Sequence, residues 1–172
     1  MRTGFHISDQ PPSGTCGDPL AHEPRICADI RLKGETMSNV PTVQAMYEAF
    51  GAGDGAGFLS HLADDVEWEQ WADNQAAAAG VPWLQPYKGR DAVGGFLAAA
   101  AQMEIVDLQI LNIMEGGNEV AVSFVIEASL PQCGGRSYRD EEIHLWTFNA
   151  EGKIARLRHY VDTAKHIQAF RG

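Results

Sequence analysis

The sequence predicts an α+β fold in which helices precede a long, curved antiparallel sheet. Apolar residues recur with helical spacing at Val43, Met46, Tyr47 and Phe50. After about residue 101 the apolar period changes to two, and short turns that contain Gly or Asn separate the alternating segments. Because the helices are collected before the strands rather than alternating with them, a doubly wound parallel sheet is disfavoured.

Composition restricts the class of partner. The chain has 172 residues, 45% of them hydrophobic, as expected for one globular domain. Its formal net charge of -10 would repel a phosphate backbone or an anionic membrane, so neither nucleic acid nor membrane is expected as a partner. The three cysteines, Cys16, Cys27 and Cys133, show no disulfide or zinc spacing, so no metal is expected and a cytoplasmic location fits best.

Residues 1-36 differ from the rest of the chain. They hold four of the eight prolines but one of the fifteen aromatic residues, and they show no helical or strand period. We therefore predict a disordered or weakly ordered tail over 1-36, followed by a folded domain over 37-172.

Three helices are expected ahead of the sheet. The first begins near Met37, has Pro41 in its first turn, and ends at Gly51. Asp54 can cap a second, short helix. The second and third helices are predicted over residues 55–62 and 90–101.

Five strands are predicted where apolar and polar residues alternate. They are predicted over residues 66–71, 105–114, 120–130, 137–148 and 153–162, with a long loop over 72–86. In the first strand, alternation places Trp68 and Gln70 on one face and Glu69 on the other. Helices covering one face of the sheet would leave a pocket between the two layers.

Five segments carry a resemblance to a known family. They are residues 43–54, Leu62-Ala63-Asp64-Asp65-Val66, Tyr87-Lys88-Gly89-Arg90-Asp91-Ala92-Val93, Phe148-Asn149-Ala150-Glu151-Gly152-Lys153-Ile154 and His159-Tyr160-Val161-Asp162-Thr163. Together they resemble the SnoaL-like and ketosteroid-isomerase-like proteins of the nuclear transport factor 2-like superfamily. The resemblance implies a cone-shaped, cystatin-like barrel, in which the curved sheet wraps around the three N-terminal helices. It also implies a homodimer. This fold carries out several reactions, so the resemblance predicts the fold more firmly than the activity.

The same resemblance suggests site residues. In ketosteroid isomerases an Asp base works with a Tyr and a protonated Asp that hold an oxyanion. Tyr47 aligns with that Tyr, and His144 stands in place of the acidic donor. Gln70 stands at the position of the base, where it cannot take a proton. His159 aligns with a working carboxylate on the last strand of SnoaL-like cyclases.

Epoxide hydrolysis is disfavoured. The related epoxide hydrolases complete their site with an Arg and an Asp two residues apart, and Ser123 and Val125 stand at these positions.

The leading hypothesis is a cofactor-free enzyme of isomerase or cyclase type that acts on a small hydrophobic carbonyl compound. Tyr47 and His144 would polarise the oxygen, and His159, with a pKa near 6.5, would move the proton. The expected pocket-lining residues are Trp68, Gln70, Phe124, Ile126 and Trp146. Two alternatives stay open, a binding module without chemistry and a dimerisation domain, because each of the three catalytic candidates could also be a core residue.

A homodimer is expected through the exposed face of the sheet. Ile143 and Leu145 share the strand face opposite His144 and would otherwise leave apolar surface in water.

Overall fold

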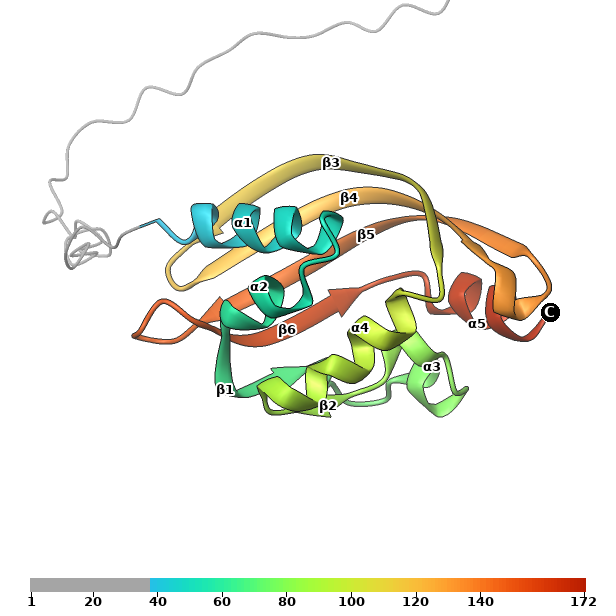
Figure 1. The fold of residues 1–172 in the computed structure, drawn as a ribbon, viewed down its shortest axis with the longest axis horizontal. Coiled ribbons are helices and arrows are strands. Elements are labelled where there is room, and N and C mark those ends of the chain that lie inside the picture. Colours follow the sequence, from blue (N-terminus) through green and yellow to red (C-terminus); the bar gives the residue numbers. More distant parts are fainter. Residues whose placement is uncertain (1–37) are drawn as a thin grey trace, which may run out of the picture. The chain divides into compact units, whose positions relative to one another are not determined.

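The computed structural model describes residues 38–172 (Figure 1). The predicted tail over 1-36, and with it the start of the domain at residue 37, lies outside the described residues. The helices are α1 (Val40–Gly51), α2 (Gly55–Ser60), α3 (Gln75–Ala78), α4 (Gly94–Ala100) and α5 (Thr163–Arg171). The strands are β1 (Leu62–Trp68), β2 (Tyr87–Lys88), β3 (Glu104–Gly116), β4 (Glu119–Leu130), β5 (Arg136–Phe148) and β6 (Ile154–Tyr160).

The predicted α+β class is confirmed. One six-stranded sheet has the order β2-β1-β6-β5-β4-β3, and its long strands β3 to β6 form an antiparallel meander. The sheet curves around α1, α2 and α4 (Figure 1). It remains open, because the described edge strands β2 and β3 do not pair with each other. One pairing differs from expectation, since β1 runs parallel to β6.

Local signals placed the first two helices correctly. A proline occupies the first turn of α1, where its missing N–H has no helical partner to lose. Asp54 caps α2, and its side chain accepts a hydrogen bond of 2.8 Å from the backbone N–H of Gly57.

Other elements depart from the sequence prediction. The expected loop over 72–86 contains the short helix α3 and a 3-10 turn, Pro82–Leu84. The third helix is shorter than predicted, because a 3-10 turn over Arg90–Val93 precedes α4. The C-terminal helix α5 was not predicted, and Asp162, expected at the end of a strand, caps it instead.

The core lies between the helices and the concave face of the sheet. Trp68 of β1, Phe124 of β4 and Trp146 of β5 are almost fully buried there, together with Met46 of α1 and Phe58 of α2. This layer of large side chains surrounds the cavity described below. None of the helices within residues 38–172 has the length and apolar character needed to cross a membrane.

Candidate active site

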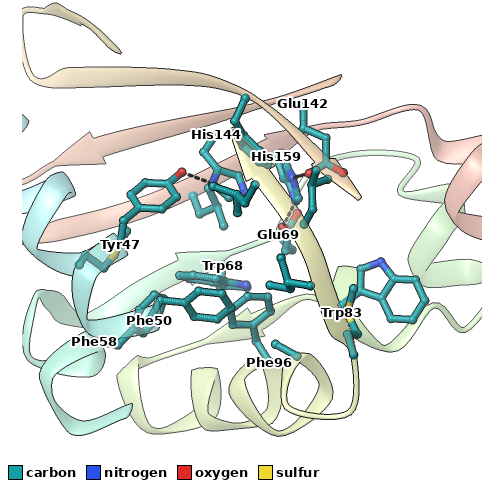
Figure 2. Close-up of a pocket in the computed structure, with 18 of the residues that line it drawn as sticks. Tyr47, Phe50, Phe58, Trp68, Glu69, Trp83, Phe96, Glu142, His144 and His159 are labelled. Carbon is teal, nitrogen blue, oxygen red and sulfur yellow. Dashed lines mark hydrogen bonds and ion pairs between the residues drawn. The ribbon is translucent and has the colours of Figure 1, made fainter. Parts of the chain in front are cut away.

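An apolar cavity of about 80 Å³ lies between the helices and the sheet (Figure 2). This volume has room for on the order of five water molecules. Aromatic side chains from all three covering helices and from the sheet line it, including Tyr47, Phe50, Phe58, Phe96, Trp68, Phe124 and Trp146. A wider groove shares Tyr47, Phe50 and Phe58 with the cavity and extends along α4 and β3 to Leu97 and Ile110.

Glu69 brings a carboxylate into this cavity from the end of β1. Its backbone adopts a left-handed conformation with φ of 55°, which ends the strand alternation at Trp68. The side chain therefore lines the cavity and is only 1% exposed, although alternation had placed it on the opposite face from Trp68. Oε2 of Glu69 has no hydrogen-bond partner within residues 38–172.

Gln70 does not line the cavity, contrary to expectation. Its side-chain amide donates a 2.7 Å hydrogen bond to the carbonyl oxygen of Tyr87 and so ties the end of β1 to β2. The left-handed conformation of Glu69 is the reason. It breaks the strand alternation, so that Glu69 and not Gln70 lies on the interior side after Trp68. The carboxylate that faces the interior at this point is Glu69, one residue before Gln70.

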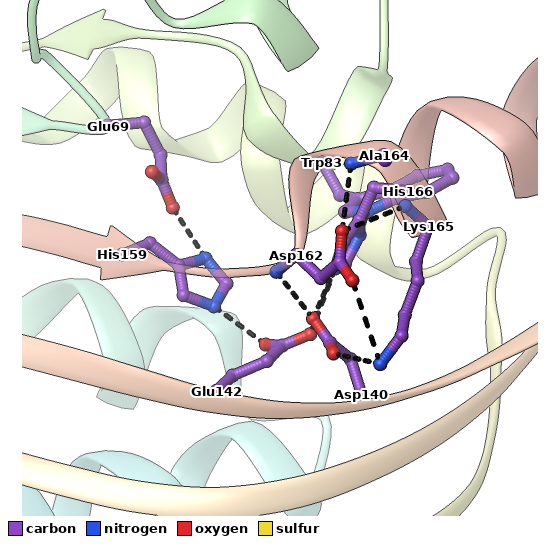
Figure 3. Close-up of polar contacts among 9 residues, drawn as sticks. All are labelled: Glu69, Trp83, Asp140, Glu142, His159, Asp162, Ala164, Lys165 and His166. Carbon is purple, nitrogen blue, oxygen red and sulfur yellow. Dashed lines mark hydrogen bonds and ion pairs between the residues drawn. The ribbon is translucent and has the colours of Figure 1, made fainter.

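His159 of β6 connects two buried carboxylates (Figure 3). Its Nδ1 lies 2.9 Å from Oε1 of Glu69, and its Nε2 lies 2.7 Å from Oε2 of Glu142. Burial disfavours the charged imidazole, but the two carboxylates outweigh this effect and raise the pKa of His159 to about 10. His159 is therefore an imidazolium at neutral pH. The expectation of a free base with a pKa near 6.5 was wrong.

The two carboxylates differ in basicity. Burial raises the pKa of Glu69 above its ordinary value, and the attraction of His159 offsets this only in part. Burial also disfavours ionisation of Glu142, but His159 and His166 together hold its pKa well below the usual range. The more basic carboxylate of the pair is thus Glu69, which lines the cavity and whose Oε2 is unpaired within residues 38–172.

Tyr47 and His144 form a second polar pair in the cavity wall. The hydroxyl of Tyr47 lies 2.5 Å from Nδ1 of His144 (Figure 2). Burial raises the pKa of Tyr47. Burial, with a smaller contribution from charged His159, lowers the pKa of His144 well below its ordinary value. Both groups are therefore neutral, and either one can be the donor in their hydrogen bond.

The two pairs lie next to each other. His144 and His159 are register partners on β5 and β6, and their ring centroids are 4.2 Å apart. The structure thus brings together the three catalytic candidates Tyr47, His144 and His159. Four predicted lining residues, Trp68, Phe124, Ile126 and Trp146, also border the cavity.

A further group of polar contacts joins the cavity wall to α5 and was not anticipated. His166 of α5 is fully buried, and its Nε2 lies 3.1 Å from Oε1 of Glu142. The indole N–H of Trp83 donates a 2.9 Å hydrogen bond to Nδ1 of His166. Asp140 accepts hydrogen bonds from the Lys165 ammonium and from the backbone N–H of Asp162. His166 and Lys165 could not be placed beside the sheet from the sequence, because helix α5 was not predicted.

Two groups of side chains place three potential metal ligands within 4.8 Å of one another. They are Glu142, His144 and His159, and Asp140, Glu142 and His166. In the first group both nitrogens of His159 already face carboxylates. In the second group Nδ1 of His166 accepts the indole proton, so Nε2 carries the ring hydrogen and offers no lone pair. Neither group is arranged for a cation.

The sequence profile of the SnoaL-like domain family matches residues 43–157. No curated protein matches the sequence. The chain is similar to several solved structures. One is an NTF2-like protein of unknown function from Burkholderia pseudomallei, with 27% identity and a TM-score of 0.64 over 79% of this chain and 100% of that chain.

Two other similar structures contain or are named for a small molecule. TerC, co-crystallised with polyporic acid, is 25% identical, with a TM-score of 0.62 over 77% of this chain and 97% of that chain. A computationally designed 17-OHP binder is 22% identical, with a TM-score of 0.59 over 75% of this chain and 97% of that chain, and this likeness concerns the fold alone.

Proposed function

The chain belongs to the SnoaL-like domain family, and from this premise we propose that it catalyses proton transfer on a small hydrophobic carbonyl compound, as an isomerase or a cyclase does. One observation carries the proposal. Glu69 is a buried carboxylate with a raised pKa that lines the largely apolar cavity, and its Oε2 has no hydrogen-bond partner within residues 38–172. Such a group can act as a general base, because it accepts a proton more readily than an exposed carboxylate does.

Glu69 would remove a proton from the carbon next to the carbonyl group. Its Oε1 is held by Nδ1 of His159, which orients the carboxylate and leaves Oε2 for the substrate. The raised pKa makes the carboxylate a stronger base than an exposed Glu. In this scheme His159 does not move the proton itself. It remains charged and stabilises the ionised form of Glu69 before the reaction.

Tyr47 and His144 would bind the carbonyl oxygen. When Nδ1–H of His144 donates to the Tyr47 oxygen, the hydroxyl hydrogen of Tyr47 is free to donate to a ligand in the cavity. Because the pKa of Tyr47 is raised by burial, the hydroxyl keeps its proton at neutral pH. A donor held in place in an apolar site stabilises the negative charge that develops on an enolate oxygen.

The walls of the cavity favour a flat, apolar ligand. Phe50, Phe58 and Phe96 gather opposite the polar groups, and the rings of Phe96 and Trp68 are 4.8 Å apart. TerC, which shares the fold and was co-crystallised with polyporic acid, supports a small-molecule ligand.

Exchange of α-protons tests this function without knowledge of the natural substrate. The wild-type protein is incubated in D₂O with a panel of aryl and cyclic ketones, and deuterium incorporation is measured by mass spectrometry. We expect Glu69→Gln to lower the exchange rate by at least about 10²-fold. Glu67→Gln is the matched control, because Glu67 lies on the same strand with its side chain in solvent, and it should retain the wild-type rate.

A binding module without chemistry is the second candidate. The observation that favours it is the cavity itself, whose lining is mostly aromatic and aliphatic. Ketones that raise the melting temperature of the wild-type protein but acquire no deuterium would establish this function and exclude catalysis of enolisation.

A further inference from the structure

A series of polar side chains connects the cavity wall with helix α5 (Figure 3). It leads from Glu69 through His159 and Glu142 to His166, which in turn accepts a hydrogen bond from the indole of Trp83, another lining residue of the cavity. His166 lies outside the cavity wall and is 0% exposed, so it cannot touch a ligand there.

The indole of Trp83 determines which nitrogen of His166 carries hydrogen. An indole N–H can only donate, so Nδ1 of His166 must accept, and the neutral ring then carries its hydrogen on Nε2. Nε2 lies 3.1 Å from Glu142 and 3.5 Å from Asp140. Within residues 38–172 neither Nε2 of His166 nor Oε1 of Glu142 has a partner with hydrogen-bond geometry, so the closest group that faces the Nε2 hydrogen is this carboxylate oxygen.

Building on the proposed function, we propose that His166 is a positioning residue, which Trp83 orients so that it holds Glu142 against His159 and thereby keeps His159 on Glu69. The two oxygens of Glu142 face different histidines, Oε2 toward His159 and Oε1 toward His166. Nε2 of His166, next to Oε1, keeps Glu142 ionised and holds its other oxygen at the distance at which it contacts His159. The base at the cavity therefore depends on a residue that does not reach the ligand.

Several other charged or titratable groups face His159 and His166. His159 faces Glu69 from the end of β1, and Glu142 and His144 from β5. His166 faces Tyr138, Asp140 and Glu142 from β5, and Lys165 of its own helix bonds to Asp140. Among these groups Glu142 alone touches both histidines, so a change at His166 reaches His159 through it.

Imidazole NMR tests the proposal without any substrate. In the full-length, ¹⁵N-labelled protein the ring nitrogens of His159 are assigned by their loss in His159→Gln, and their titration is followed from pH 5 to 11. The wild-type midpoint should lie near the pKa of about 10. His166→Leu removes the contact with Glu142 and should lower the midpoint of His159 by at least about one pH unit.

A conservative variant separates positioning from packing. In His166→Gln the amide oxygen can accept from Trp83 and the amide nitrogen can donate to Glu142, so the midpoint of His159 should stay within about 0.5 pH unit of wild type. If His166→Leu does not fold, Trp83→Phe replaces it. Without the indole donor His166 is no longer restricted to one tautomer, and the midpoint of His159 should again fall.

An unchanged midpoint in both His166→Leu and Trp83→Phe would overturn the proposal, as would an equal fall in His166→Leu and His166→Gln. Deuterium exchange decides the proposed function separately. A lowered midpoint together with a lack of exchange in the wild-type protein would support the positioning of His159 by His166 and reject the enzyme.

Discussion

Raising the pH should remove the charge that holds Glu69, His159 and Glu142 together, and we expect the free energy of unfolding to fall as a result. In the folded protein the pKa of His159 is raised to about 10 by the two carboxylates, despite burial. In the unfolded chain the pKa of a His is about 6.5. Between these values the folded state binds one more proton than the unfolded chain. The contribution is therefore complete below pH 6.5 and is lost as the pH rises toward 10.

The size of the effect follows from the same two values. A folded pKa of about 10 against about 6.5 corresponds to at most about 5 kcal/mol. Burial raises the pKa of Glu69, which weakens its half of the ion pair. We therefore expect a loss on the order of 2 to 5 kcal/mol, equivalent to a fall in melting temperature of roughly 10 °C for a domain of this size.

Chemical denaturation followed by circular dichroism between pH 6 and 10.5 measures this loss. His159→Gln should be less stable than wild type at pH 6 and should change far less as the pH rises. His61→Gln is the control, because burial and Lys153 lower the pKa of His61, so its own titration cannot cause a loss of stability as the pH rises. It should follow the wild-type profile. Parallel stability profiles for wild type and His159→Gln would refute the assignment of a charged His159.

Two further predictions concern the cavity and the outer face of the sheet. Tyr47→Phe keeps the ring packed against Trp146 but deletes the hydroxyl, so deuterium exchange should slow by about 10²-fold while ketone binding is retained; an unchanged rate would remove Tyr47 from the proposed oxyanion site. Ile143 and Tyr160 are register partners on β5 and β6 with 38% and 47% of their surface exposed, so we expect a homodimer through this face. Light scattering should give twice the 18.7 kDa of one chain for wild type and a shift toward the monomer for Ile143→Lys; a wild-type mass of 18.7 kDa would contradict this.

Part of the sheet could be predicted because β4 and β5 are long and alternate between buried and more exposed positions. Strands predicted over 120–130 and 137–148 correspond to β4 and β5, which each begin one residue earlier. Alternation over a dozen residues leaves little freedom in such strands. The parallel pairing of β1 with β6 could not be read in this way, since it joins segments about 90 residues apart and no turn between them specifies the direction.

The site was harder to predict because one backbone conformation changed the face on which a side chain lies. Strand alternation assigned Glu69 to the solvent side of Trp68, and a left-handed conformation at a residue other than glycine is unfavourable by about 1 to 3 kcal/mol. In the structure Glu69 gains a buried ion pair with His159, which comes from a strand 90 residues later, and this contact offsets the cost. A buried carboxylate is stabilised by a cationic partner, and His159 on β6 supplies that partner for Glu69. The face on which Glu69 lies therefore depends on a residue that a local reading of β1 does not include.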